Sequence, residues 1–345
     1  MVHTFKLPAI PVITQRDIKF FFKYFRSIDQ ILCQRYSLGF CPDEEHLTSI
    51  LCELLDDRGS QLHQLPYSIA DLNIDLEKSG SLLKAQVSLE TKTYDNYQER
   101  YFTQSDLGII LEYKDRIDPT YNFTIGILVQ AKRLFPDARK KYSLASKYNS
   151  FDQEQYKRFE NLINSFENNC DCSECGKYLL YNPNFSDFAK NEKEKILHCQ
   201  LLKDSISIFQ DASRLNQYRE IYDVGSELSL LPMGSLIVSL KGIQQIATEQ
   251  GLSSNKNSRS EPKLLPFTLQ KVVENIDIYQ SSLPWFIVIG MMVLGKGCSC
   301  EEFIKLVTAG RDTSHIARNF EFPPPRYSLR IALTAGEEQP EEEEF

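Results

Sequence analysis

Polar side chains near the ends of two apolar segments have the residue types that metal-dependent chemistry requires. Residues 107–113 follow Asp106, and residues 125–132 contain Gln130 and Lys132 close to their end. Side chains alternate between the two faces of a strand, so Gln130 and Lys132 are expected to share one face. An amide oxygen and an ammonium group would then lie side by side.

The polar connection between these segments contains an Asp-Pro pair at residues 118–119, and this turn chemistry favours an antiparallel pairing. Asp106 would then lie near Gln130. An aspartate and an amide oxygen form a hard-oxygen site that suits Mg²⁺ or Mn²⁺. Lys132 beside such an ion would orient or help deprotonate a water molecule and stabilise the charge that develops on a phosphodiester.

Gln130 supplies a neutral amide, which holds a metal ion less strongly than a carboxylate would. Another carboxylate nearby would therefore help to hold the cation. Residues 43–55 are predicted to form a helix with a buried apolar face, and Pro42 and Asp43 fit its start. Glu44 falls at the edge of that face, whereas Glu45 lies farther towards solvent. Glu44 is therefore the preferred inward acid and Glu45 the next candidate.

Together these motifs resemble the PD-(D/E)xK, restriction-endonuclease-like nuclease superfamily, in the Gln-x-Lys variant of uncharacterised bacterial proteins. The resemblance covers roughly residues 42–183 and extends more weakly towards residue 310. Besides the triplet, the acidic helix and the Asp106 strand, it includes Thr91-Lys92 with Glu99, a helix with Gln153, Gln155 and Tyr156, the strand at 177–182, and Leu283-Pro284-Trp285.

The resemblance implies an α/β fold with a restriction-endonuclease-like mixed β-sheet flanked by helices and a mainly helical C-terminal extension. It also implies a Mg²⁺-dependent (or Mn²⁺-dependent) endonuclease that hydrolyses phosphodiester bonds, with DNA as the favoured substrate and bacterial defence against foreign DNA as its role. The residues carried over as catalytic are Asp106, Gln130, Lys132, Glu44, Glu45 and Gln155, with the metal at Asp106, Gln130 and Glu44. An RNA nuclease on the same fold is an alternative.

Each of these residues also has a purely structural interpretation. Asp106 would cap a turn, Glu44 and Glu45 would be favourable charges in a first helical turn, and Lys132 would belong to a solvated strand end. The chain would then have the fold without the metal site.

A basic stretch follows the triplet and is interleaved with tyrosines. Positive charge beside a phosphodiesterase site would hold a nucleic-acid backbone, and the alternative is a solvated helix face and loop. The residues expected to contact nucleic acid are Arg133, Arg139, Lys140 and Lys141.

A cysteine cluster suggests a second, structural metal. Cys170, Cys172 and Cys175 have thiolate spacing suited to Zn²⁺, with Cys199 as the assigned fourth ligand and His198, Cys298 or Cys300 as alternatives. A catalytically silent, zinc-supported interaction or regulatory module is thus a function of a different class. The remaining interpretation is that these are thiols in a reducing cytosol.

Composition agrees with an ordinary globular protein. The 345 residues are 42% hydrophobic, which is sufficient for a substantial core. Nine cysteines and an N-terminus without a signal-peptide pattern favour a cytoplasmic location. The apolar segment 283–294 is too short to span a membrane, so a buried core element is expected and no membrane partner.

Four regions are predicted along the chain: an N-terminal helical segment at 1–41 that packs on the core, a nuclease-like core at 42–183, an extension of unknown role at 184–335, and an acidic disordered tail at 336–345. The tail contributes six of the acids behind the net charge of −8, so the remainder carries only about −2. That balance permits a nucleic-acid partner. A homo-oligomer or a defence-system partner protein also remains open.

Overall fold

The protein was analysed as a computed structural model. The structure describes residues 9–37, 43–56, 65–91, 105–137, 141–169, 174–196, 234–248, 264–274, 280–308 and 325–336. Several sequence predictions fall outside these ranges, among them the acidic tail and the Lys92 and Glu99 parts of the resemblance.

Within these ranges three helices precede the first strand, and strands and helices are mixed along the rest of the chain. The strands are β1 (Leu83–Thr91), β2 (Leu107–Asp115), β3 (Phe123–Arg133), β4 (Gly176–Tyr181), β5 (Leu236–Ser239), β6 (Gln280–Ser282) and β7 (Tyr327–Ala335). The helices are α1 (Gln15–Ser37), α2 (Glu44–Leu55), α4 (Ile69–Lys78), α6 (Gln153–Asn169), α9 (Leu240–Ala247), α10 (Leu269–Glu274), α11 (Leu283–Trp285) and α12 (Glu301–Thr308), with short η1 (Pro119–Tyr121) and η2 (Phe185–Asp187) and the π-helical η3 (Phe286–Val293).

The described strands form one seven-stranded mixed sheet in the order β1-β7-β2-β3-β4-β5-β6. β2 is parallel to β7 and β3 is parallel to β4, whereas the other neighbours are antiparallel. The predicted antiparallel pairing of the two apolar segments is confirmed, with Leu107 opposite Val129. The prediction of an α/β protein with a mixed sheet flanked by helices is also confirmed.

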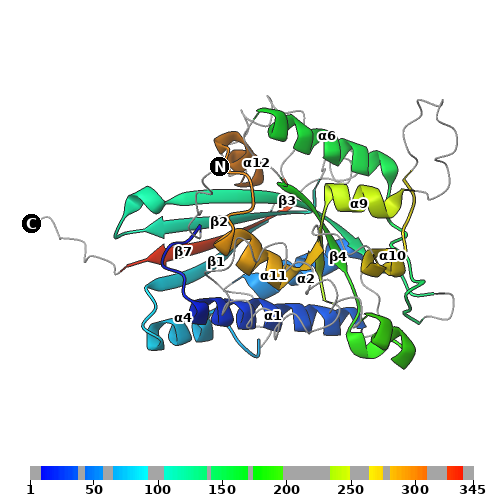
Figure 1. The fold of residues 1–345 in the computed structure, drawn as a ribbon, viewed down its shortest axis with the longest axis horizontal. Helices are drawn as coiled ribbons and strands as arrows, with labels where there is room; N and C mark the ends of the chain where they lie inside the picture. The colour runs from blue at the N-terminus through cyan, green and yellow to red at the C-terminus, as the bar shows by residue number, and fades with distance from the viewer. Residues whose placement is uncertain are drawn as a thin grey trace, which may run out of the picture.

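Helices cover both faces of the sheet (Figure 1). α1, α2, α4, α11 and η3 pack on one face, and α6, α9, α10 and α12 pack on the other. β3 lies in the middle and is buried along almost its whole length. Such a strand reads as a continuous apolar run, because neither of its faces meets solvent.

The two faces of β3 contact different layers. Val129 and Ala131 pack in the core beneath α1 and α2, whereas Leu128 packs in the core beneath α6. Gln130 and Lys132 alternate with Val129 and Ala131, so they face the α6 side. α6 connects β3 to its parallel neighbour β4 and therefore crosses over the face that carries these two polar side chains.

The sheet continues past the predicted boundary at residue 183. The described part of the region 184–335 contributes β5, β6 and β7 in addition to α9, α10, α11, α12, η2 and η3, and β7 is inserted between β1 and β2. Its Tyr327 lies opposite Leu107 of β2 and opposite Thr91 of β1. The predicted mainly helical extension is not confirmed, because this region also supplies three strands of the same sheet. One of them, β7, lies inside the sheet between two other strands.

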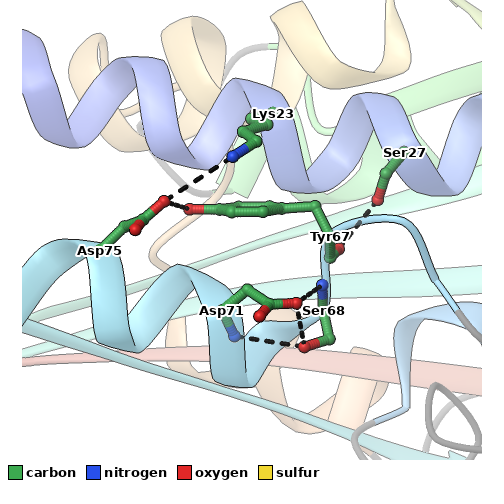
Figure 2. A network of polar contacts seen from close by, with 6 residues as sticks. All are labelled: Lys23, Ser27, Tyr67, Ser68, Asp71 and Asp75. Atoms are coloured by element: carbon green, nitrogen blue, oxygen red, sulfur yellow. Dashed lines mark hydrogen bonds and ion pairs between the residues drawn. The ribbon is translucent and has the colours of Figure 1, made fainter.

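A polar network connects α1 to the start of α4 (Figure 2). The hydroxyl of Tyr67 donates to Asp75 Oδ2 at 2.8 Å, and Lys23 Nζ lies 3.8 Å from the same oxygen and 3.8 Å from the centroid of the Tyr67 ring. Ser27 donates to the Tyr67 backbone oxygen at 3.0 Å. Ser68 and Asp71 form a capping box that fixes the first turn of α4, which packs beside β1.

The apolar segment around Trp285 is a core element, as predicted. The residues of η3 are all buried, and Trp285 itself packs against Phe22 of α1. In the part of the chain that the structure describes, no helix has the length and apolar character needed to cross a membrane.

Gly108 of β2 provides a test of how closely the α12 layer packs on the sheet. A Cβ at this position would lie 2.6 Å from Val307 Cγ1 and 3.0 Å from Pro325 Cγ, and both neighbours are stiff side chains. We expect Gly108→Ala to lower the free energy of unfolding by about 1–3 kcal/mol, measured by urea denaturation.

Gly126→Ala of β3 is the matched control. Its Cβ would meet the flexible end of Ile304 at 3.0 Å, so a smaller loss is expected. Equal losses for the two variants would contradict the packing described here.

Candidate functional site

Asp106 lies immediately before β2 and contacts the end of β3. Its carboxylate Oδ2 accepts hydrogen bonds from the Gln130 side-chain Nε2 at 2.5 Å and from the Ala131 backbone N–H at 2.7 Å. Its own backbone N–H donates to the Val129 oxygen at 2.9 Å. The predicted proximity of Asp106 and Gln130 is therefore present in the structure.

The environment of Asp106 raises its pKa to about 6. Burial is the largest cause, because it disfavours the charged form, and the carboxylates of Glu44 and Glu45 act in the same direction. Lys132 and the Ala131 N–H oppose the shift. The carboxyl group therefore titrates near neutral pH, where a bound cation would favour its ionised form.

Gln130 presents an unusual buried oxygen. Its side chain is 2% exposed and Nε2 is committed to Asp106, but Oε1 has no hydrogen-bond partner among the described residues. Tyr178 lies opposite Gln130 in the β3–β4 register, and its buried hydroxyl also has no partner there. Buried polar groups are paired in most native structures, so each of these two atoms is a position where a ligand or water would complete the bonding.

Lys132 is held by the helix that follows the strand. Its ammonium donates to Gln155 Oε1 at 2.9 Å, and its side chain is only 3% exposed. Gln155 lies in the first turn of α6, where its backbone N–H is capped by Asp152 Oδ1 at 2.7 Å. The cap fixes the start of α6, and Gln155 in turn positions the ammonium without neutralising its charge.

The two glutamates at the start of α2 point to different partners. Glu44 is partly buried, and its Oε1 accepts hydrogen bonds from the Arg133 backbone N–H at 3.1 Å and from the Ser150 hydroxyl. Glu45 is exposed and forms an ion pair with Arg326. Glu44 is thus the more inward acid. Its Oε1, however, is bonded to the backbone at the end of β3.

Arg326 was missed by sequence reasoning. It precedes β7, and the parallel β2–β7 register places it level with Asp106, although the two residues are far apart in the chain. The Tyr327 N–H donates to the Asp106 backbone oxygen at 3.3 Å. A single arginine after a run of prolines gives no local signal, so only the strand order reveals its position.

The predicted nucleic-acid contacts are only partly described. Arg133 places its guanidinium 4.1 Å from the centroid of the Phe135 ring, and Lys141 is exposed. Arg139 and Lys140 lie outside the described residues. Two of the tyrosines that interleave the basic stretch, Tyr148 and Tyr156, are buried in the core and cannot stack on bases from there.

The cysteine site is likewise described only at Cys175, because Cys170, Cys172 and Cys199 lie outside the described ranges. Cys175 is a buried thiol whose backbone oxygen accepts from Leu128 of β3. Cys298, one of the alternative ligands, pairs with Gly126 farther back on β3 and is in a disulfide. A disulfide sulfur is not a thiolate ligand, so Cys298 does not serve as the alternative zinc ligand in this structure.

The side chains at this end of β2 and β3 include the type of oxygen atom that Mg²⁺ takes as a ligand. Among the described residues, no group of three or more His, Cys, Asp or Glu side chains could hold a metal ion. Mg²⁺, however, commonly keeps several waters and uses one or two carboxylates plus substrate phosphates. The Asp106 carboxylate and the unpartnered Gln130 Oε1 supply two such hard oxygens.

Comparisons of the chain with protein-family models, curated proteins and solved structures found no match. A functional proposal for this chain therefore depends on the geometry of its own residues.

The raised pKa of Asp106 predicts that Asp106→Asn stabilises the protein at neutral pH. The neutral carboxyl group favours the folded state below about pH 4, and this contribution is lost as the pH rises through the folded pKa of about 6. Because Asp106 is partly exposed, we expect a gain of about 1–2 kcal/mol at a pH of about 7.5 and none below a pH of about 3.5.

Urea denaturation across this pH range measures the effect. Asp187→Asn, at an exposed aspartate, is the control and should change the free energy of unfolding by less than about 0.5 kcal/mol. A pH-independent effect of Asp106→Asn would contradict the electrostatic cause.

Proposed function

We propose that this protein is a Mg²⁺-dependent (or Mn²⁺-dependent) nuclease that hydrolyses phosphodiester bonds of nucleic acid. The observation that carries the proposal is that Asp106, Gln130 and Lys132 lie at the same end of the neighbouring strands β2 and β3, with Gln130 Oε1 buried and unpartnered among the described residues. A carboxylate, an amide oxygen and an ammonium in this arrangement match the needs of phosphoryl chemistry at a metal.

Asp106 and Gln130 would hold the metal, which when bound would polarise the phosphodiester and lower the pKa of a coordinated water. Lys132, oriented by Gln155, would position the attacking water and stabilise negative charge as it develops on the phosphate. Asp106 must be ionised to bind a cation, so its raised pKa makes metal affinity fall as the pH drops through about 6.

The order of the elements along the chain supports the same proposal. The acidic helix α2, the Asp106 strand β2, the Gln-x-Lys strand β3 and the Gln155 helix α6 occur in the order expected for a PD-(D/E)xK nuclease, and their functional residues lie at the end of β3. We propose on this basis that the sheet is of the restriction-endonuclease-like type. DNA as substrate and a role in defence against foreign DNA belong to the same proposal.

A second candidate is a catalytically silent protein of the same fold. It is favoured by the hydrogen bond from Gln130 to Asp106, which satisfies the carboxylate without a metal, and by the Glu44 oxygen that is bonded to the end of β3. In this case the site would be a structural polar cluster, and a zinc-supported interaction role would remain for the protein.

A cleavage assay separates the two candidates. The parent, incubated with labelled DNA or RNA and Mg²⁺ or Mn²⁺, is expected to cut, with activity abolished by EDTA. Lys132→Ala and Asp106→Ala should each lower the rate by about 100-fold or more, because the first removes a charge that stabilises the reacting phosphate and the second removes a ligand of the metal.

Lys114→Ala is the matched lysine control. Lys114 is 63% exposed and lies eight residues farther along β2 than Asp106, so its replacement should leave cleavage unchanged. Parent activity in both site variants would disprove the mechanism. No cleavage by the parent with either metal and either nucleic acid would favour the silent protein.

Gln130→Glu tests whether Oε1 is a metal ligand. A second carboxylate next to Asp106 should destabilise the metal-free protein by about 1–3 kcal/mol, because like charges are then buried together. Mg²⁺ should reverse this loss and bind about tenfold or more tightly than to the parent, since it gains a charged ligand.

Thermal denaturation with increasing Mg²⁺ measures both effects. The control is Gln86→Glu on β1, where the side chain is exposed and no metal-dependent stabilisation is expected. A Gln130→Glu protein that Mg²⁺ does not stabilise would show that this edge of the sheet holds no metal.

A further inference from the structure

Among the described residues, the start of β7 adds a further cation, Arg326, that belongs to none of the sequence motifs discussed above. Arg326 lies level with Asp106 across the parallel β2–β7 pair, on the strand next to the one that Asp106 begins. Lys132, the cation already assigned, comes instead from β3 on the other side of β2. The candidate site is thus bordered by a positive side chain on each of its two neighbouring strands.

The guanidinium of Arg326 pairs with a carboxylate that is exposed to solvent. It pairs with Glu45, whose side chain is 56% exposed, while Arg326 itself is 27% exposed. An ion pair this open to solvent adds little to stability, because water and salt screen it. A dianionic or diester phosphate could therefore replace Glu45 without loss of a strongly stabilising contact.

Arginine is also the residue best suited to such an exchange. Its planar fork binds the oxygens of a carboxylate and those of a phosphate in the same geometry, so the Glu45 carboxylate can occupy the position of a phosphate group. We infer that Arg326 binds a backbone phosphate of the nucleic-acid substrate beside Asp106, and that Glu45 holds this arginine in place until substrate arrives. This inference rests on the proposed nuclease function.

The exchange also accounts for the charge around the site. Glu44, Glu45 and Asp106 are acidic, and a polyanion approaching them would be repelled unless nearby cations are available. When phosphate replaces Glu45 at Arg326, the glutamate is released to solvent and the arginine offsets the phosphate charge. Removing the Glu45 charge should therefore strengthen binding of substrate, the opposite of what loss of a structural ion pair would do.

The experiment measures binding without cleavage. Fluorescence anisotropy of a labelled DNA duplex and a labelled single-stranded RNA is recorded in EDTA over a series of KCl concentrations. Arg326→Ala should weaken binding by about five- to tenfold and reduce the slope of log affinity against log salt by about 1, as expected for the loss of one phosphate contact. Arg326→Lys should lose less affinity and keep the slope.

Glu45→Gln provides the second variant, which does not remove the arginine. It should strengthen binding by about two- to fivefold, because an exposed ion pair no longer competes with phosphate. In an Arg326→Ala background the Glu45→Gln substitution should have no effect on binding. This coupling separates phosphate binding by Arg326 from a general change in surface charge.

The chain offers a matched control on the same two strands. Arg330 of β7, which is 52% exposed and lies four residues beyond Arg326, forms an ion pair with Glu112 of β2. Arg330→Ala and Glu112→Gln should leave the salt slope unchanged.

Two results would overturn the inference. If the parent binds nucleic acid and the Arg326 and Glu45 variants bind with its affinity and salt slope, the inference fails while the proposed function stands. If the parent binds neither DNA nor RNA, both fail together.

Discussion

The hydrogen bonds that Asp106 accepts from Gln130 and from the Ala131 backbone connect the start of β2 to the end of β3, and the site depends on them. They place a carboxylate beside an amide whose oxygen is left unpartnered among the described residues. The same strand end is bonded by Glu44 of α2 and, through Lys132, by Gln155 of α6. Helices from opposite faces of the sheet therefore each contribute a side chain that bonds to the end of β3.

The site combines charges that oppose one another. Burial and the nearby glutamates raise the pKa of Asp106, whereas Lys132 lowers it. Lys132 is bonded by a neutral amide, so its charge remains available to a phosphate. In the proposed nuclease such an arrangement would gain stability when a cation and an anion bind, which is the pattern expected where stability is traded for activity.

The sequence was informative where the signal is local. The two apolar segments and the Asp-Pro turn between them predicted the hairpin that brings Asp106 to Gln130, and helical periodicity predicted that Glu44 lies farther inward than Glu45. Tertiary context decided the rest. Whether Glu44 reaches a metal depends on its bond to Arg133, and the position of Arg326 follows from strand order, which no local pattern encodes. Tyr148 and Tyr156 interleave the basic stretch in the sequence, yet both are buried in the core on the α6 side of the sheet.

The insertion of β7 between β1 and β2 has a consequence for how the protein is made. Among the described strands, β7 is the one that pairs with both β1 and β2. β1 ends at Thr91 and β7 begins at Tyr327, so about 235 residues must be synthesised between them before the described sheet can close. At roughly 5–20 residues per second, translation leaves β1 and β2 without their common partner for on the order of 10–50 seconds. Because Arg326 directly precedes β7, the nascent chain has the hairpin that joins Asp106 to Gln130 well before it has the arginine that lies level with Asp106.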